Sequence, residues 1–303
     1  MSESRKGFLL GLAAYGIWGL FPLYWPLLEP AGAIEILAHR IFWSLAIVAV
    51  LIWVTGRIGR FRRLVTSRRE VMILAAAAAV ITVNWGTYIW GVNNGHVVET
   101  SLGYFINPLV TLLLGVIFIA ERLRPVQWLA MGIAAAAVIV LTVDYGHLPY
   151  LSLTLAFSFG TYGLLKKKAN VGAIEGLGIE TLILGPIALG YLIWLWSQGT
   201  ASYLGAPWWH DALLILSGLV TAVPLLFFGA AATRVPMSTL GLQQYLAPTL
   251  QMLIGLVLLH EAMTPVRWIG FILVWIALVI FTADSLRNHR RRQMALAVQA
   301  TAA

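Results

Sequence analysis

Long apolar runs recur along this chain of 303 residues, and they constrain its fold more than any other feature. The hydrocarbon core of a bilayer is about 30 Å thick, so a helix that crosses it needs roughly 20 consecutive apolar residues. Runs of this kind cover residues 8–28, 34–54, 71–91, 97–119, 126–143, 148–165, 173–196, 211–232, 237–259 and 266–284. The pattern predicts an all-α integral membrane protein with ten transmembrane helices.

The composition agrees with a membrane protein and excludes several other classes. Charged residues make up 11% of the chain, against about 25% in soluble domains. The net charge is +8, but the basic residues lie in short clusters between apolar runs, which argues against a nucleic-acid partner. The chain has no cysteine, no phosphate-binding loop, no HExxH motif and no histidine-rich metal spacing. We therefore expect no cofactor, no metal and no nucleotide partner.

The distribution of basic residues predicts the orientation in the membrane. Of the 20 Lys and Arg residues, Arg40 lies inside a predicted span and Arg267 lies on one side. The remaining 20 − 2 = 18 fall in loops and termini that share the other side if there are ten spans. Cytoplasmic loops carry such an excess of positive charge, so both termini are expected to be cytoplasmic.

The chain matches itself when shifted by 140 residues. Ala33-Ile34-Glu35 aligns with Ala173-Ile174-Glu175, and Pro108 aligns with Pro248. With four further residues of offset, YGIWGL (15–20) aligns with FGTYGL (159–164). Each half then holds five spans, and because five is odd the second half enters the membrane from the opposite side. Inverted repeats are typical of secondary transporters, in which one half rocks against the other. The predicted units are a first repeat (1–145), an inverted second repeat (146–286) and a cytoplasmic tail (287–303).

Several strings of residues also resemble a known family. They are AHRIFWS (38–44), NWGTYIWGVNNGH (84–96), ETSLGYFINPL (99–109), AATR (231–234) and STLGLQQYLAPT (238–249). Together with the paired five-helix halves, they resemble the EamA repeats of the drug/metabolite transporter superfamily and, more closely, its RarD branch. The resemblance implies a bacterial inner-membrane permease with a ten-helix basket around a central cavity. It further implies a secondary active exporter of small amphipathic metabolites or drugs, and RarD names refer to chloramphenicol.

The candidate substrate cavity lies near the two equivalent prolines, Pro108 and Pro248. Each falls near the bilayer midplane, where proline removes a backbone hydrogen bond and frees a carbonyl group. Pro224 is expected to interrupt the eighth span in the same way. Polar and aromatic residues at similar depth complete the predicted cavity: Asn84, Tyr88, Ser101, Tyr104, Asn107, Tyr162, Gln243, Gln244 and Tyr245. The alternative is that the prolines are packing kinks and the amides join helices to one another.

Charged residues inside spans form a second candidate set, for ion coupling or an outer vestibule: Glu35, His39, Arg40, Glu99 and Glu180. Such residues are costly in a membrane and point to function. Arg40 either pairs structurally with an acid such as Glu99, or lines the vestibule while His39 or a glutamate relays a proton. Glu121 and Glu261, which follow the fourth span of each half, are expected to bond to helix ends.

Three other functions stay open at this point. A facilitative permease would need no ion coupling. An intramembrane enzyme would use His39 and Glu35 as acid and base, but no second catalytic cluster accompanies them. A membrane scaffold would not need prolines at matching depths in the two halves. The expected partners are a small-molecule substrate and membrane lipids, with a homodimer as an open question.

Overall fold

The computed structural model describes residues 3–119, 123–232, 234–235 and 237–302, and within these ranges it is helical and contains no strand. The elements are α1 (Glu3–Gly19), α2 (Phe21–Tyr24), η1 (Trp25–Leu28), α3 (Ala33–Val54), α4 (Ile58–Val65), α5 (Arg68–Asn93), α6 (Val97–Ile119), α7 (Pro125–Tyr145), α8 (Tyr150–Ala169), α9 (Ala173–Ser197), α10 (Trp208–Ala232), α11 (Met237–Gln243), α12 (Leu246–Leu253), η2 (Ile254–Leu258, a π-helix) and α13 (Pro265–Ala302).

Seven helices in the described part are long and apolar enough to cross a membrane, namely α3, α5, α6, α7, α9, α10 and α13. The count rises to eight if α1 and the segment Phe21–Leu28, which meet at 43°, form one bent span. Two predicted spans differ from this description. Span 148–165 corresponds to α8, whose last turn carries three lysines, and span 237–259 is divided into α11, α12 and η2. The chain is thus all-helical with several apolar helices, and the count of ten stays a prediction.

The prolines affect their helices differently. Pro108 lies inside α6 and Pro224 inside α10, and both helices continue through them, so neither proline is the interruption that the sequence predicts. Proline in a transmembrane helix removes one hydrogen bond, and neighbouring helices can make up for the loss. Around Pro248 the chain does break, because α11 ends at Gln243 and α12 begins at Leu246.

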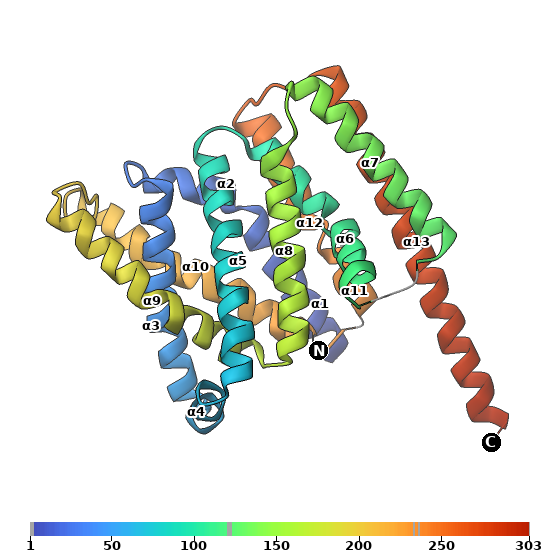
Figure 1. Ribbon diagram of the computed structural model, residues 1–303, viewed down its shortest axis with the longest axis horizontal. Coiled ribbons are helices and arrows are strands. Elements are labelled where there is room, and N and C mark those ends of the chain that lie inside the picture. Colours follow the sequence, from blue (N-terminus) through green and yellow to red (C-terminus); the bar gives the residue numbers. More distant parts are fainter. Residues whose placement is uncertain (1–2, 120–122, 233, 236, 303) are drawn as a thin grey trace.

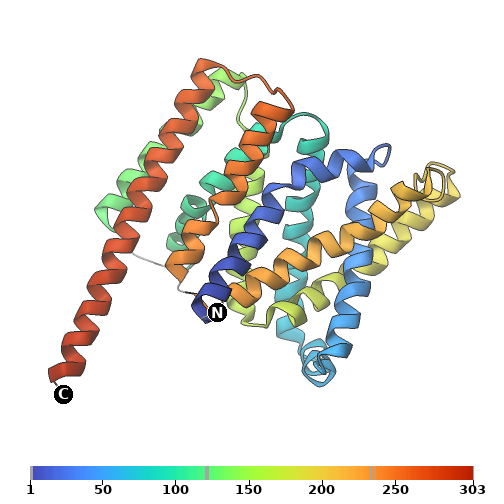
Figure 2. The ribbon, with the colours of Figure 1, turned by 180° about the vertical axis from the view of Figure 1, so that it is seen from behind.

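The helices run between two opposite ends of the bundle, as Figure 1 shows. One end carries the start of α1, the short basic helix α4 and the lysine-bearing end of α8, and we call it the basic end. The loops after α2–η1, α7 and α9 lie at the far end. Of the tail predicted at residues 287–303, the described part continues α13 as helix to Ala302 and extends past the bundle at the basic end (Figures 1 and 2).

Contacts between helices form a closed succession around the centre of the bundle. Going round, α1 packs on α12, α12 on α6, α6 on α8, α8 on α5, α5 on α3, α3 on α10, and α10 on α1. The pair α7–α13 packs outside this ring against α6 (Figure 2). Glycine permits the closest crossings: a Cβ at Gly218 of α10 would lie 2.5 Å from the backbone carbon of Trp43 in α3. Small residues commonly bring membrane helices together in this way.

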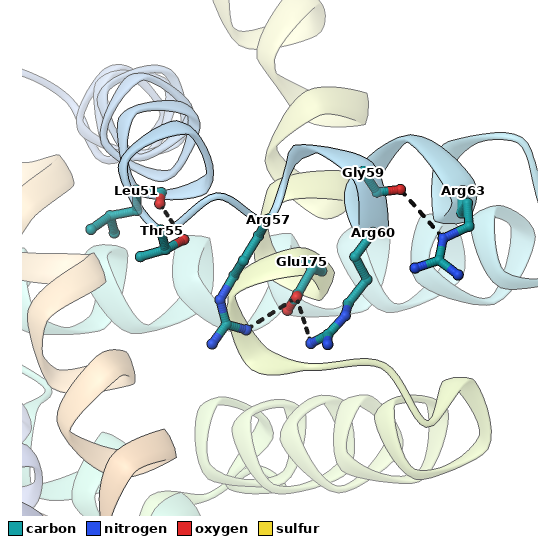
Figure 3. Close-up of polar contacts among 7 residues, drawn as sticks. All are labelled: Leu51, Thr55, Arg57, Gly59, Arg60, Arg63 and Glu175. Carbon is teal, nitrogen blue, oxygen red and sulfur yellow. Dashed lines mark hydrogen bonds and ion pairs between the residues drawn. The ribbon is translucent and has the colours of Figure 1, made fainter.

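Two helix pairs are clamped at both ends, and each pair contains one helix from each half. At the far end, Glu35 of α3 accepts hydrogen bonds from the backbone N–H and the hydroxyl of Ser202, both at 2.8 Å. At the basic end, Glu175 of α9 accepts from Arg57 at 3.1 Å and from Arg60 at 3.3 Å, as Figure 3 shows. Each helix therefore holds the chain segment that follows its partner, which makes α3 and α9 antiparallel.

The pair α7–α13 repeats this arrangement. Asp144, near the end of α7, accepts from Arg267 Nε and from Thr264 Oγ1, each at 2.7 Å. Asp284 of α13 accepts from Arg124 Nε at 2.8 Å, at the start of α7. Asp144 and Asp284 are 140 residues apart, so the two clamps occupy equivalent places in the sequence repeat.

Glu261 caps the far end of α6. Its two carboxylate oxygens accept hydrogen bonds from the backbone N–H groups of Val97 at 2.6 Å and Val98 at 2.8 Å. A carboxylate suits this position because a helix N-terminus presents unpaired N–H groups and partial positive charge. The predicted helix-end role of Glu261 is confirmed, and Glu121 lies outside the described residues.

Candidate substrate site

Arg40 sits in an aromatic enclosure. The residue is 3% exposed, about 10 Å along α3 from its first residue. Its guanidinium carbon lies 4.0 Å from the ring centroid of Trp85, 5.1 Å from that of Trp25 and 5.7 Å from that of Phe21. Arg40 Nε donates to Thr221 Oγ1 of α10 at 2.7 Å. Attraction between a cation and aromatic rings is strongest when both are removed from water.

The local sequence explains how two of these rings reach Arg40. Proline stands within the first two positions of both α2 and η1, at Pro22 and Pro26, and the chain bends by 43° after α1. Proline is favoured at the start of a helix, where its missing N–H is not needed. The bend brings Phe21 and Trp25 into the buried cluster around α3, and Trp25 is 0% exposed.

The predicted pairing of Arg40 with Glu99 is wrong. Among the described residues Arg40 forms a hydrogen bond to Thr221 and contacts with rings, and no ion pair. Glu99 is buried beside α8, where Ser152 Oγ donates to its backbone carbonyl, and its Oε1 has no hydrogen-bond partner. Depth along a helix follows from the sequence, but the direction in which a side chain points depends on how the helix is rotated.

Asn84 is the centre of a buried polar network. The residue is 1% exposed, and its Nδ2 donates to the Leu155 carbonyl and to Ser158 Oγ, both at 3.0 Å. Its Oδ1 accepts from the hydroxyl of Tyr104 at 3.1 Å. The ring of Tyr104 meets that of Tyr88 edge to face at 5.5 Å, and the Tyr88 hydroxyl is buried without a hydrogen-bond partner. Three predicted cavity residues, Asn84, Tyr88 and Tyr104, therefore lie together.

Glu35 and His39 share the face of α3 that meets the loop after α9. Glu35 binds Ser202 as described above, and the His39 ring lies 5.0 Å from that of Tyr203. Both ring nitrogens of His39 are buried without hydrogen-bond partners in the described structure. Because Glu35 is engaged by the loop and makes no hydrogen bond to His39, the two do not form an acid–base pair.

Glu180 forms a second charged cluster, toward the basic end. It is 1% exposed, and its carboxylate accepts from Lys166 Nζ at 2.8 Å and from the Tyr162 hydroxyl at 3.1 Å. Gly176 of α9 leaves the space that Lys166 Nζ occupies. Glu180 follows Arg40 by 180 − 40 = 140 residues, so the two halves place opposite charges at equivalent positions.

The other predicted cavity residues lie apart from the Asn84 network. Gln243 donates to the Phe8 carbonyl of α1, and Tyr245 reaches Thr282 of α13 at 3.3 Å. The Ser101 hydroxyl bonds to its own helix at the Val98 carbonyl. Gln244 is half-buried in the break between α11 and α12. These four residues are thus apart from the central network, as are Tyr162, which bonds to Glu180, and Asn107, described next.

Pro108 lines a separate cavity, and Asn107 lies beside it without being one of its lining residues. A space of about 270 Å³ lies between α6, α8 and α13, lined by Pro108, Thr111, Leu112, Gly115, Gly163, Leu164, Lys167 and Phe281. Asn107 is half-buried, and its Oδ1 is 3.5 Å from Thr111 Oγ1. Pro108 therefore faces open space on the basic-end half of α6, although it does not break the helix.

Sequence reasoning missed several residues of these clusters. Trp85, Phe21, Trp25 and Thr221 surround Arg40, and Lys166 neutralises Glu180. The sequence does carry one signal for the pairing of Lys166 with Glu180. The two residues are 14 apart and lie on consecutive helices, α8 and α9, that a short loop joins. The described residues hold no group of three or more His, Cys, Asp or Glu side chains arranged to bind a metal ion.

Comparison with known proteins gives one consistent result. The EamA-like transporter family matches the chain twice, over residues 5–143 and residues 149–283. Protein RarD of Streptomyces exfoliatus is 55% identical over 295 residues, which cover 97% of this chain and 94% of that protein. Protein RarD of Escherichia coli is 43% identical over 289 residues, 95% of this chain and 98% of that protein. One solved crystal structure superposes with a TM-score of 0.58 and 16% identity over 93% of this chain and 98% of its own, which shows likeness of fold alone.

Proposed function

The chain is a RarD-type permease of the EamA-like transporter family, and we propose that it exports small amphipathic organic molecules across the bacterial inner membrane as a secondary active transporter. The observation that carries this proposal is the buried network of Asn84, Tyr88 and Tyr104, which joins α5, α6 and α8 of the ring and shares a hydrophobic cluster with the rings around Arg40. Sites for small molecules are mostly apolar, with a few polar groups placed to orient the ligand. The resemblance to RarD proteins, one of which has a name that refers to chloramphenicol, is the support for metabolites or drugs as the substrate class.

The clamps indicate which helices would move during alternating access. The pairs α3–α9 and α7–α13 are each tied at both ends, and each tie joins the two halves of the chain. Rocking of one complete half against the other would break these contacts. We propose instead that the inner helices bend, at the 43° corner after α1 and at the break between α11 and α12. The π-helix η2 next to that break supports this location, because such segments are frequent at functional sites.

The proposed orientation places the basic end in the cytoplasm. One support is the positive charge of the 18 Lys and Arg residues that the sequence places in loops and termini on one side. The other is that the start of α1, α4 and the end of α13 all lie at the basic end of the bundle (Figure 1). Single-cysteine labelling is simple here because the chain has no cysteine. We expect probes at residues 57–69 and after residue 303 to be protected from impermeant reagents outside the cell. Probes near residues 94 and 205 should react, and one reversed site would contradict the ten-span model.

Substitution of two asparagines distinguishes a ligand contact from a helix contact. A thermal-shift screen of the purified protein against metabolites and antibiotics first identifies a stabilising ligand, since a ligand that binds the folded state raises its melting temperature. Asn107→Leu should then weaken that ligand's binding and its counterflow in proteoliposomes, with little change in the ligand-free melting temperature. Asn84→Leu should weaken the same binding, because it removes a polar group of the proposed site, and should also lower the ligand-free melting temperature, because the Tyr104 hydroxyl would stay buried without its partner.

The unmodified protein provides the reference for both variants. No counterflow of any stabilising ligand in sealed proteoliposomes would contradict transport itself. Counterflow that is insensitive to an imposed pH gradient, with no accumulation of substrate, would favour a facilitative permease over a coupled exporter. A large fall in melting temperature for Asn107→Leu would make this residue a helix contact.

A further inference from the structure

Arg40 is a buried cation that lacks a counter-ion in the described structure. Among these residues its Nε donates to Thr221, and its two terminal nitrogens have no acceptor. A guanidinium carries five N–H donors, so four of them stay unused. Removal of a charge from water is unfavourable unless partners replace the water. The rings of Trp85, Trp25 and Phe21 compensate in part, but rings accept no hydrogen bond in the plane of the guanidinium.

The second half of the chain shows what is missing in the first. Glu180, at the position equivalent to Arg40, receives its counter-ion from Lys166 of α8. The first and sixth predicted spans align with an offset of 144 residues, so Lys166 corresponds to residue 166 − 144 = 22, which is Pro22. Proline cannot supply a charge. The first repeat therefore keeps a buried charge without the side chain that would neutralise it.

Four acids at the ends of the spans already bind other residues. Glu35 binds Ser202, and Glu175 binds Arg57 and Arg60. The clamp acids Asp144 and Asp284 hold Arg267 and Arg124 at the outer helix pair. None of the ion pairs among the described residues includes Arg40, so an anion bound from outside the chain would supply the missing charge.

The surroundings of Arg40 define the chemistry of such a partner. The fork of terminal N–H groups matches the two oxygens of a carboxylate, which it can bind with two parallel hydrogen bonds. Tyr88, which is 2% exposed, belongs to the same buried cluster as Phe21, Trp25 and Trp85, and its hydroxyl, which has no partner, can donate a further hydrogen bond. Aromatic walls favour a ligand with a flat or apolar body, because rings stack offset or edge to face.

We propose that Arg40 binds the anionic group of the transported molecule, and that the substrates are small organic carboxylates with an aromatic or apolar body. The carboxylate oxygens accept from the two terminal nitrogens of Arg40, and the apolar body lies among Trp85 and the neighbouring rings. Transport of the bound molecule rests on the function proposed above, whereas its binding at Arg40 does not.

The test compares carboxylates with their neutral amides. Purified protein is titrated with benzoate, phenylacetate and indole-3-acetate, and in parallel with benzamide, phenylacetamide and indole-3-acetamide, while melting temperature and binding heat are recorded. In the wild type at least one acid should stabilise the protein more than its amide. Arg40→Gln should weaken the binding of that acid by about tenfold or more, which is the effect expected when a hydrogen bond to a charged group is lost. It should leave the affinity for the amide unchanged.

Arg267→Gln is the matched control, because Arg267 also lies over an aromatic ring, Tyr145 at 4.5 Å, but is neutralised by Asp144. It should retain the preference for the acid. An equal response to acids and amides in the wild type overturns the proposal without any variant, as does an Arg40→Gln protein that keeps the preference. Stabilisation by chloride or nitrate alone would overturn the assignment of an organic carboxylate.

Proteoliposomes separate this inference from the function on which it rests. Acid binding that depends on Arg40, without flux of the acid, would contradict transport and leave the anion site in place. Flux of a neutral ligand that is unaffected by Arg40→Gln would support transport and overturn the carboxylate assignment.

Discussion

Replacement of Gly218 by alanine is expected to destabilise the protein more than any other change of a single methyl group. A Cβ at this position would lie 2.5 Å from the backbone carbon and 2.6 Å from the Cβ of Trp43, and 2.8 Å from the backbone nitrogen of Ser44. Backbone atoms cannot move away as a flexible side chain can, so α3 and α10 would have to separate. Overpacking of this kind costs about 3 kcal/mol at the upper end of its usual range.

The separation would also disturb the candidate site, because the same crossing brings Thr221 of α10 to Arg40 of α3. Gly132→Ala is the matched control. A Cβ at Gly132 in α7 meets nothing within 4 Å, so the substitution should be neutral or raise stability slightly through helix propensity. Melting in detergent, followed by size-exclusion chromatography, measures both. Equal melting temperatures for the two variants would mean that the α3–α10 crossing is looser than the structure describes.

Much of the fold could be predicted from the sequence because the bilayer imposes one strong rule. A span needs roughly 20 apolar residues, and α3, α5, α6, α7, α9, α10 and α13 lie where the apolar runs predict them. The break between α11 and α12 is harder to predict from the sequence, because the segment has the composition of a span and only Pro248 signals the break. Pro108 and Pro224 carry the same signal in unbroken helices, so proline alone does not decide continuity.

The candidate site could be predicted in part, and the limit is geometric. Depth in the membrane follows from the rise per residue, so Asn84 and Tyr104 were placed at a similar level and do meet. Rotation about the helix axis depends on the neighbouring helices, which the sequence does not name. Gln243 consequently faces α1, Tyr245 faces α13, and Arg40 faces Trp85 instead of Glu99.

Substitution of Lys166 by methionine should have the second large effect, because it leaves the buried carboxylate of Glu180 without its cation. The Glu180 side chain is 2% exposed and that of Lys166 is 22% exposed, so little water would replace the lost contact. Removal of one partner from a buried pair costs about 3 kcal/mol or more. The Tyr162 hydroxyl would still donate to Glu180, but one neutral hydrogen bond does not balance the charge.

The double variant Lys166→Met with Glu180→Gln should recover most of the lost stability, since no unpaired charge is then left. Glu180→Gln alone should cost less than Lys166→Met, because the longer and partly exposed lysine can reach toward water. Melting temperatures of the three variants and the wild type form a double-mutant cycle for this pair. Additive effects would show that the ion pair contributes nothing beyond its separate side chains.

The same cluster tests ion coupling. If Glu180 carries the coupling proton, Glu180→Gln cannot gain or lose it, and substrate will no longer accumulate in proteoliposomes under an imposed pH gradient. Counterflow without a gradient should persist, because the Arg40 and Asn84 clusters toward which we place the substrate are not changed. His39→Gln is the comparison, as its ring is the other buried group proposed for proton relay. Accumulation by Glu180→Gln at the wild-type level, together with its loss in His39→Gln, would place coupling at the far end instead.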